Sequence, residues 1–243
     1  MTHIAEFVIF ISSSTTSNTK SRTLKPPLAA RRPAMTALHH QVRLRWCLQH
    51  LHSNLNMWSN VMFSDESRFC LQELDHRVKV WRRCKEHYAD CGSNRVTAYG
   101  GGTGKTRLVI IGGNFNADRY QDVILQPVAI PYLQSLGPIS ILQDDNAHPH
   151  RGGFIRAYLQ NLGVERMEWP ASSPDLNPIE HLWDQLQRAV HARVTNTTTL
   201  ADLRQMLVEE WDAIRQQCVT RLVTSMRRRC QATEALYGSS TRY

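Results

Sequence analysis

Residues 139–150 read ISILQDDNAHPH, an apolar run that ends in two adjacent acids followed by two histidines. A short apolar run of this kind is typical of a buried β-strand, and polar residues directly after it fall at the edge of the sheet. Two other acids stand in comparable contexts. Asp65 ends the run VMFSD, and Glu180 opens the amphipathic stretch NPIEHLWDQLQRAV. An α/β fold can bring three such carboxylates to one edge of a sheet.

If the fold brings these three carboxylates together, they can form a metal centre, with Asp65, Asp145 and Glu180 as the candidate ligands. Mg²⁺ and Mn²⁺ prefer oxygen ligands, and two such ions about 3.5–4 Å apart can hold both oxygens of a phosphodiester exchange. Asp144 precedes Asp145 and, on a strand, would point to the opposite face. Only one of these two neighbours can therefore be a ligand if the strand continues that far.

Each of these residues also has a purely structural explanation. The NPIE motif at residues 177–180 is a well-formed helix start, with Asn as N-cap, Pro at the first position and Glu at the third. Asp145 suits an ordinary turn and Asp65 a strand end. His148 and His150 either orient a phosphate or a metal-bound water, or only satisfy a loop.

Two further motifs are weaker. The stretch GGGTGKT at residues 100–106 is close to a phosphate-binding loop, but Tyr99 stands where that motif requires its first glycine. Cys84, His87 and Cys91 have spacings that suit zinc, yet no fourth ligand follows at regular spacing. We therefore favour a loop junction for the first motif and a surface loop for the second.

The chain is basic, with 29 Lys and Arg against 21 Asp and Glu, a formal charge of +8 and a pI near 9.4. This excess favours a polyanionic partner, although a solvated basic surface gives the same composition. Six widely spaced cysteines argue against a disulfide scaffold and favour a reduced, intracellular protein. No segment has the length of a membrane span.

The pattern of elements predicts one α/β domain at residues 35–200. A disordered segment is expected at residues 1–34 and a helical extension at 201–243. Within the domain, Thr36 is placed to cap a helix over 37–57, and a helix from 117 to 136 should be interrupted near Pro127 and Pro131. Strands are expected near residues 60–64, 77–82, 107–113, 139–145 and 164–170, and helices near 151–163, 177–194, 199–215 and 217–236.

Taken together, three motifs resemble the DDE transposases of the Tc/mariner superfamily, most closely its Tc branch. The motifs are FSDESRF at residues 63–69, QDDNAHPH at 143–150 and SPDLNPIEHLWD at 173–184. Residues 146–179, 34 in number, separate Asp145 from Glu180, and this spacing is that of the Tc branch. The resemblance therefore selects Asp145 over Asp144.

The resemblance implies an RNase H-like α/β fold, a mixed sheet flanked by helices, in which the three acids bind two Mg²⁺ or Mn²⁺ ions. Water would first cleave a transposon end, and the freed 3′-hydroxyl would then attack target DNA. The implied partner is double-stranded DNA, both transposon ends and target, bound by a homodimer in the nucleus. The candidate DNA contacts are His150, Arg227, Arg228 and Arg229.

The chain departs from the family pattern in two places. Nothing comparable to the family's paired helix-turn-helix units precedes the catalytic region. The family also has a hydrophobic strand of the type VMVWG after its GGG, whereas here GGG runs directly into TGKTRLVII. This indicates the loss of one core strand, which would pair beside the strand of Asp65. Two functions stay open: an active transposase catalytic domain, or a catalytically inactive or domesticated remnant that only binds DNA.

Overall fold

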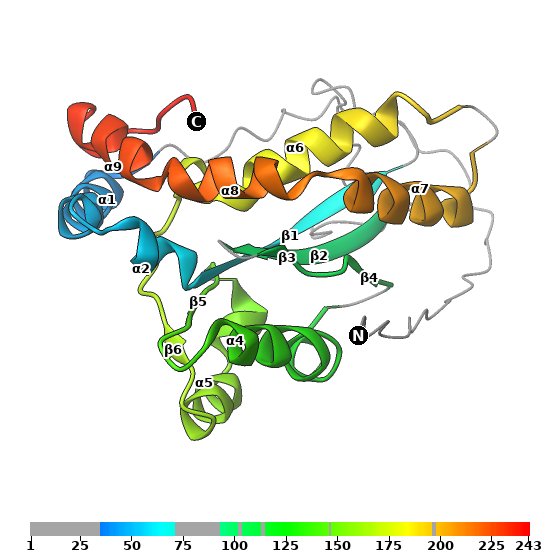
Figure 1. Ribbon diagram of the computed structural model, residues 1–243, viewed down its shortest axis with the longest axis horizontal. Helices are drawn as coiled ribbons and strands as arrows, with labels where there is room; N and C mark the ends of the chain where they lie inside the picture. The colour runs from blue at the N-terminus through cyan, green and yellow to red at the C-terminus, as the bar shows by residue number, and fades with distance from the viewer. Residues whose placement is uncertain (1–34, 71–92, 102–103, 113–114, 146, 196–197) are drawn as a thin grey trace, which may run out of the picture.

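A computed structural model gives the structure of the protein (Figure 1). It describes residues 35–70, 93–101, 104–112, 115–145, 147–195 and 198–243. The N-terminal segment 1–34, the expected strand at 77–82 and the candidate zinc loop at 84–91 lie outside the described residues.

A mixed sheet forms the centre of the molecule. Its longest strand, β1 (Val61–Cys70), pairs antiparallel with β2 (Ser93–Gly101) on one side and parallel with β5 (Ile141–Gln143) on the other. β6 (Glu165–Arg166) continues the parallel side. The β-type runs that ended in Asp65 and Asp145 are therefore neighbouring strands, and the predicted mixed sheet is confirmed.

The expected gap beside the strand of Asp65 is not present, because β2 fills that position and pairs with β1 along its whole length. Only short strands occupy the next position outward, on the far side of β2. There β3 (Gly104–Lys105) and β4 (Val109–Ile111), of two and three residues, both pair with β2. Within the GGGTGKT stretch, Gly100 and Gly101 end β2, and Gly104 and Lys105 form β3.

Helices cover both faces of the sheet in two layers (Figure 1). Helices α6, α7 and α8 lie on one face, α4 and α5 lie on the other, and α1 packs against α9 at one end. Among the described residues, none of the helices combines the length and apolar character that a membrane crossing requires. The helices are α1 (Ala37–His50), α2 (Leu55–Ser59), α3 (Ala117–Arg119), α4 (Ile130–Leu136), α5 (Gly153–Asn161), α6 (Pro178–His191), α7 (Leu200–Ala213), α8 (Gln216–Thr224) and α9 (Met226–Ala235).

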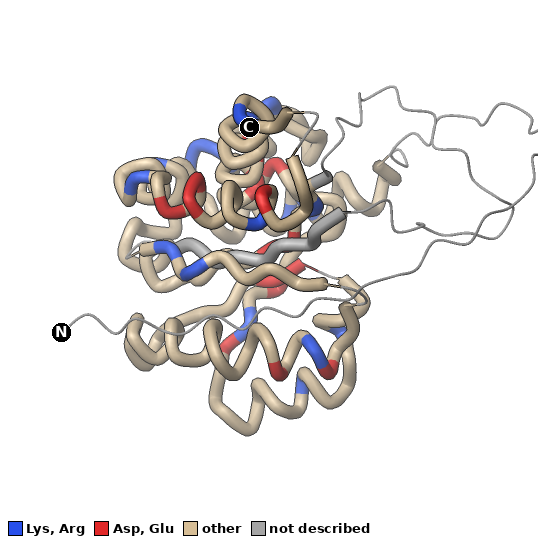
Figure 2. Tube along the Cα trace, turned by 90° about the vertical axis from the view of Figure 1, so that its right-hand side faces the viewer, with Lys and Arg blue, Asp and Glu red and all other residues tan. Residues whose placement is uncertain are grey.

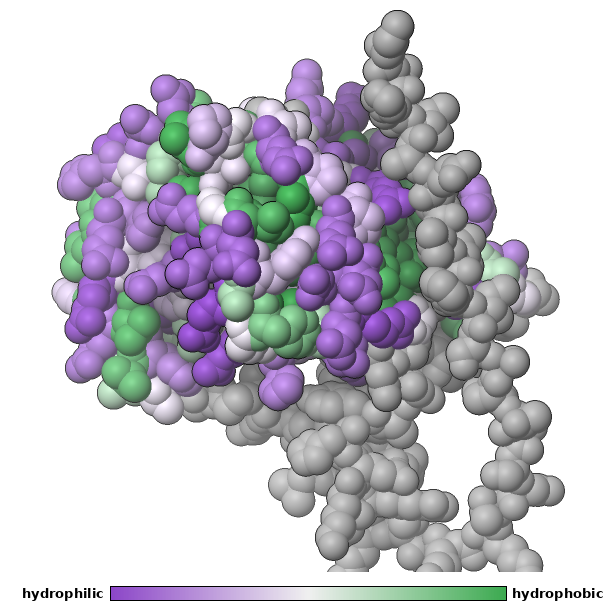
Figure 3. Space-filling model, turned by 90° about the horizontal axis from the view of Figure 1, so that it is seen from below, coloured by the Kyte–Doolittle hydropathy of each residue, from purple (hydrophilic) through white to green (hydrophobic). Residues whose placement is uncertain are grey.

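The apolar residues of each layer meet the sheet in a separate core. Leu182, Leu186 and Trp211 from the α6–α7 layer are buried together with Phe69 of β1. On the opposite face, a second core holds Met62 of β1 with side chains from α5 and the segment 120–136. The outer surface of that second layer shows hydrophobic patches divided by hydrophilic side chains (Figure 3). Both faces of β1 are therefore buried, which fixes its register.

The expected interruption at the two prolines does not occur. A π-helix (Tyr120–Ala129) connects α3 to α4 without a break, although Pro127 lies inside it. The backbone N–H of Ile130 donates to the carbonyl of Leu125, five residues earlier. This wider turn changes which carbonyl faces the proline ring, and the ring otherwise clashes with the carbonyl four residues before it. Pro131 lies in the first turn of α4, where its missing N–H costs little.

Helix α6 starts as the sequence predicts. The side chain of Asn177 accepts a hydrogen bond from the N–H of Ile179 at 3.4 Å, and Pro178 is the first helical residue. Thr36 likewise caps α1, through a reciprocal pair of hydrogen bonds with His39. A cap fixes the first turn of its helix, so Glu180 has a defined place in the fold.

A buried ion pair joins three distant parts of the chain. The guanidinium of Arg43 in α1 donates to both carboxylate oxygens of Asp175, at 2.8 and 2.7 Å. The backbone N–H and hydroxyl of Thr241 also donate to Asp175, and Arg229 of α9 donates to its backbone carbonyl. Arg43 donates further to the carbonyl of Gly238. We call Arg43, Asp175, Arg229 and Thr241 the arginine–aspartate hub. It holds the loop that leads into α6.

Burial works to raise the pKa of Asp175, but the hydrogen bonds from Arg43 and Thr241 outweigh it, and the pKa is lowered. A carboxyl whose pKa is lower in the folded state contributes stability above its unfolded pKa, which is about 3.9. That contribution is lost as the pH falls through the folded-state pKa. The hub is therefore sensitive to acid.

We predict that Asp175→Asn lowers the free energy of unfolding at pH 7 by about 3–5 kcal/mol, because it leaves Arg43 buried without its counter-charge. The difference from the wild type should begin to narrow below about pH 4, where the carboxyl of the unfolded chain takes up a proton, and should be lost as the pH falls through the lower folded-state pKa. Urea unfolding followed by tryptophan fluorescence at several pH values measures both effects.

The matched control is Asp184→Asn on α6, since Asp184 pairs with Arg188 at an exposed site. That change should cost less than about 1 kcal/mol. Equal losses from the two variants at pH 7 would contradict a stabilising role of the hub.

Candidate active site

The parallel register of β1 and β5 brings two of the predicted acids to the same level. The last paired residues are Phe63 and Gln143, and Asp65 and Asp145 each follow two residues later. Both chains continue in the same direction from aligned positions, so Asp65, still within β1, and Asp145, just beyond β5, come to the same level of the sheet. The sequence predicted each strand, and the pairing supplies their alignment.

Asp65 lies inside β1 and is partly exposed. One carboxylate oxygen accepts from the N–H of Glu66 at 2.7 Å, and the other faces the amide nitrogen of Asn177 at 3.5 Å. The amide of Asn177 thus lies between Asp65 and the start of α6, which it caps. This places the first turn of α6, and with it Glu180, beside the end of β1.

The charges of the other two predicted acids act on Asp65. Burial raises the pKa of Asp65 well above its usual value, and the negative charges of Glu180, Glu66 and Asp145 raise it further. The N–H of Glu66 acts in the opposite direction but does not compensate. Figure 2 shows a group of acidic positions near the middle of the trace, between the helical layers. Such a cluster attracts a cation.

The two adjacent acids after β5 have different surroundings. Asp144 is buried and receives both its hydrogen bonds from Arg166, at 2.6 and 2.7 Å. Burial raises its pKa, while the charges of His150 and Arg166 lower it less than burial raises it. The side chain of Asp145 is 41% exposed and accepts from the N–H of Ala147 at 2.8 Å. Asp145 is the neighbour that faces outward.

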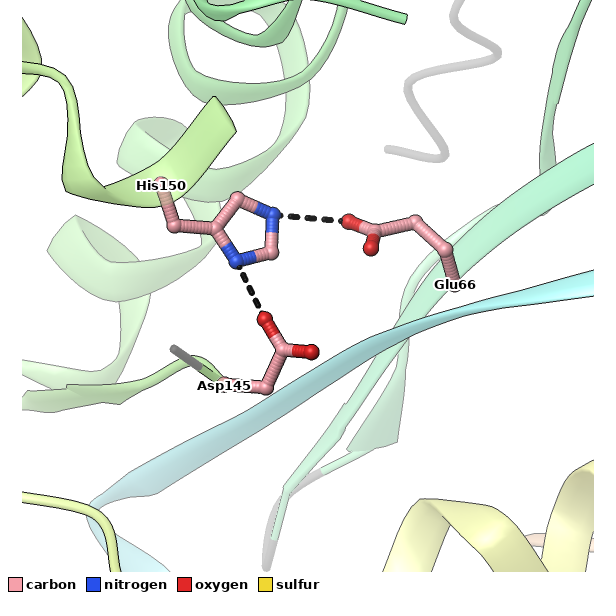
Figure 4. A group of neighbouring side chains, drawn as sticks. All are labelled: Glu66, Asp145 and His150. Carbon is pink, nitrogen blue, oxygen red and sulfur yellow. Dashed lines mark hydrogen bonds and ion pairs between the residues drawn. The ribbon is translucent and has the colours of Figure 1, made fainter. Parts of the chain in front are cut away.

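His150 lies between two carboxylates, as Figure 4 shows. Its Nδ1 is 2.7 Å from an oxygen of Asp145, and its Nε2 is 2.9 Å from an oxygen of Glu66. Burial lowers the pKa of His150, but the hydrogen bonds with Asp145 and Glu66 and the charges of Glu66 and Asp144 raise it to about 10. The ring therefore carries a positive charge at neutral pH.

The same interaction sets the pKa of Asp145. Burial works to raise it, but the hydrogen bond and charge of His150 and the N–H of Ala147 together lower it. The ligand atoms of Glu66, Asp145 and His150 all lie within 4.8 Å of one another, so this group is compact enough to hold a metal ion. Glu66 was not among the predicted site residues. The doublet Asp65–Glu66 was the signal that could have found it.

A cavity of about 370 Å³ opens beside this group. It is lined by Glu66, Arg68, Phe115, Ala147 and Pro149. The lining combines an acid, an exposed arginine and an aromatic ring, and it borders the carboxylates from the side of β1. The cluster is thus open to solvent on this side.

Two of the four candidate DNA contacts are corrected by the structure. His150 is 0% and Arg229 is 1% exposed, and both side chains bind groups of the protein itself. A buried side chain has no surface to offer a phosphate. Arg227 and Arg228 are exposed on α9 and stay candidates.

Comparison with known proteins decides the family. The profile of the DDE superfamily endonucleases matches residues 60–202. The Tc1 transposase of Caenorhabditis elegans is 31% identical over 230 residues, which cover 88% of this chain and 81% of the relative. This chain belongs to the DDE superfamily. The Tc3 transposase of the same organism is 32% identical over 202 residues, which cover 80% of this chain and 60% of the relative.

Solved structures confirm the RNase H-like fold of this DDE chain. The Mos1 transposase catalytic domain bound to Raltegravir and Mg superposes with a TM-score of 0.64 at 17% identity, over 86% of this chain and 100% of the other. A Mos1 paired-end complex with Mg gives a TM-score of 0.67 at 19% identity, over 92% and 68%. The fold of the family is therefore present here from α1 to the C-terminal helices.

Family membership identifies the function as that of a DDE transposase, DNA strand cleavage and strand transfer in transposition. The resemblance found in the sequence is confirmed. The rival reading, a remnant that only binds DNA, is not favoured. The donor set fits divalent metal, as this function requires.

The pKa shifts predict opposite effects for two neighbouring acids in metal-free protein. The ionised form of Asp65 is disfavoured by folding, so Asp65→Asn should raise the melting temperature at pH 7 in EDTA. The ionised form of Asp145 is favoured by folding, so Asp145→Asn should lower it. For a chain of this size, 1 kcal/mol corresponds to about 2–4 °C.

Calorimetry of both variants and the wild type shows whether each substitution raises or lowers the melting temperature. Shifts in the same direction would show that the acids do not repel one another as described. Repeating the scans at pH 3, where carboxyls are mostly protonated, should shrink both shifts and serves as the control.

Proposed function

We propose that Asp65, Asp145 and Glu180 together hold two divalent metal ions, Mg²⁺ or Mn²⁺, and that this is the catalytic site for DNA strand cleavage and strand transfer. One observation carries the proposal. The parallel register of β1 and β5 brings Asp65 to the level of Asp145, and burial together with the charges of Glu180, Glu66 and Asp145 raises the pKa of Asp65. Carboxylate oxygens are the ligands that these ions prefer. When bound, such ions activate water and neutralise charge at phosphorus.

Each of the three acids is held in place by a different part of the fold. Asp65 is fixed by the longest strand of the sheet, between β2 and β5. Asp145 is fixed by His150 and by the N–H of Ala147. Glu180 is fixed by the capped first turn of α6. Supports from rigid elements keep the carboxylates close together against their mutual repulsion, which is what metal binding and substrate positioning require.

The proposed partner is double-stranded DNA, both transposon ends and target. The formal charge of +8 supports binding to a polyanion, and Arg227 and Arg228 are exposed candidates for phosphate contacts. Mos1 has been solved with a left transposon end in a paired-end complex. A homodimer on DNA is proposed here by analogy with that complex, and nuclear location by analogy with the family.

The test is Mn²⁺-dependent nicking of supercoiled plasmid by the purified chain. Wild-type protein should cleave with Mn²⁺ and not with EDTA. Asp145→Asn and Glu180→Gln should lose cleavage because each replaces a negatively charged carboxylate with a neutral amide, which binds divalent ions far more weakly. Gel electrophoresis of the relaxed product measures the rate.

The control variant is Asp184→Asn, an exposed acid on the same helix as Glu180, one turn further along. It should cleave like the wild type. Cleavage that survives Glu180→Gln, or a folded wild-type protein that never cleaves, would overturn the proposal.

A further inference from the structure

We propose that His150 is a positioning residue, which together with Glu66 orients the carboxylate of Asp145 for metal binding. The inference rests on the proposed function, since it assigns a support to one of the proposed ligands. It also gives Glu66 a role different from that of the three acids. His150 acts through Asp145 and does not itself contact the substrate.

Two contacts with carboxylates fix the direction of the imidazole. Its Nε2 is hydrogen-bonded to Glu66 at 2.9 Å, and its Nδ1 makes an ion-pair contact with Asp145 at 2.7 Å (Figure 4). Glu66 lies in β1, and Asp145 follows the end of β5. The ring therefore connects β1 with the segment that follows β5.

Packing fixes the ring in its plane. The imidazole of His150 lies 4.3 Å from the ring of Tyr120, measured between centroids, and its side chain is 1% exposed. The ring of Phe115 approaches it edge-on at 6.5 Å. A ring enclosed in this way cannot turn without breaking the hydrogen bond to Glu66 and the ion pair with Asp145, so it imposes one orientation on the Asp145 carboxylate.

The backbone of His150 is held as well. Arg166 at the end of β6 binds both oxygens of Asp144 and lies 3.4 Å from the carbonyl of His150. Asp144 and Asp145 thus support the same short turn from its two sides, Asp144 through Arg166 and Asp145 through the ring. This explains why two consecutive acids stand after β5 although one of them is turned inward.

The geometry argues against His150 as a metal ligand in its own right. Each ring nitrogen already faces a carboxylate oxygen, so an ion could reach the ring only by displacing one of these carboxylates. A positioning role needs no displacement. Residues that orient a metal ligand through hydrogen bonds typically change metal affinity by about 10–100-fold when they are removed.

The test compares His150→Phe with a matched core variant, Ile155→Val, in DNA-free protein. Phenylalanine keeps a ring against Tyr120 but removes the hydrogen bond to Glu66 and the ion pair with Asp145. Ile155 is fully buried in the same core as Tyr120, and its loss of a methyl group costs about 0.5–1.5 kcal/mol without touching a carboxylate. Free Mn²⁺, counted by electron paramagnetic resonance, gives the affinity.

We expect His150→Phe to weaken Mn²⁺ binding by about 10–100-fold and Ile155→Val to leave it unchanged. The Mn²⁺ concentration for half-maximal nicking should rise in parallel, with part of the activity regained at saturating Mn²⁺. A His150→Phe protein that binds Mn²⁺ like the wild type would overturn the inference. A wild type whose Mn²⁺ binding is indifferent to Asp145→Asn would overturn the proposed site and this inference with it.

Glu66→Gln provides a second variant with little effect on shape, should His150→Phe fail to fold. The amide oxygen of Gln can still accept from Nε2, so an indirect role predicts a loss smaller than that of Asp145→Asn. A loss as complete as that of Asp145→Asn would make Glu66 a metal ligand and would overturn its assignment to positioning.

Discussion

The parallel pairing of β1 with β5 is the constraint on which the rest of the structure depends. It is only three residue pairs long, yet it brings Asp65 of β1 and Asp145 after β5 to the same level of the sheet. A slip of one residue would turn every side chain of one strand to the other face. Burial of β1 on both faces prevents such a slip, so the two helical layers serve the site indirectly by holding the register.

Around this register the chain gives each acid a different electrostatic environment. His150 lowers the pKa of Asp145 and Arg43 lowers that of Asp175, each against the cost of burial, whereas for Asp144 burial outweighs the charges of His150 and Arg166 and its pKa is raised. For Asp65, burial and the charges of Glu180, Glu66 and Asp145 all raise the pKa. The fold thus leaves negative charge concentrated at one position, and a bound cation would relieve it.

The sequence predicted the elements that local patterns encode. Asn177 and Thr36 cap their helices as expected, and the runs ending in Asp65 and Asp145 are strands. The hydrogen bond between Glu66 and His150 could not be predicted, because the two residues are 84 positions apart in the sequence and no local sequence pattern links them. The strand at β2 was missed for a similar reason, since its pairing with β1 depends on tertiary contact more than on its own apolar pattern.

The arginine–aspartate hub has a consequence for the order of folding. Its contacts close loops of 132 residues, between Arg43 and Asp175, and of 66 residues, between Asp175 and Thr241. Closing a long loop costs conformational entropy before its contacts can stabilise the fold. Such contacts are therefore expected late in folding. The loop leading into α6, and with it the placement of Glu180, therefore depends on contacts between residues that are far apart in the sequence, from Arg43 to Thr241.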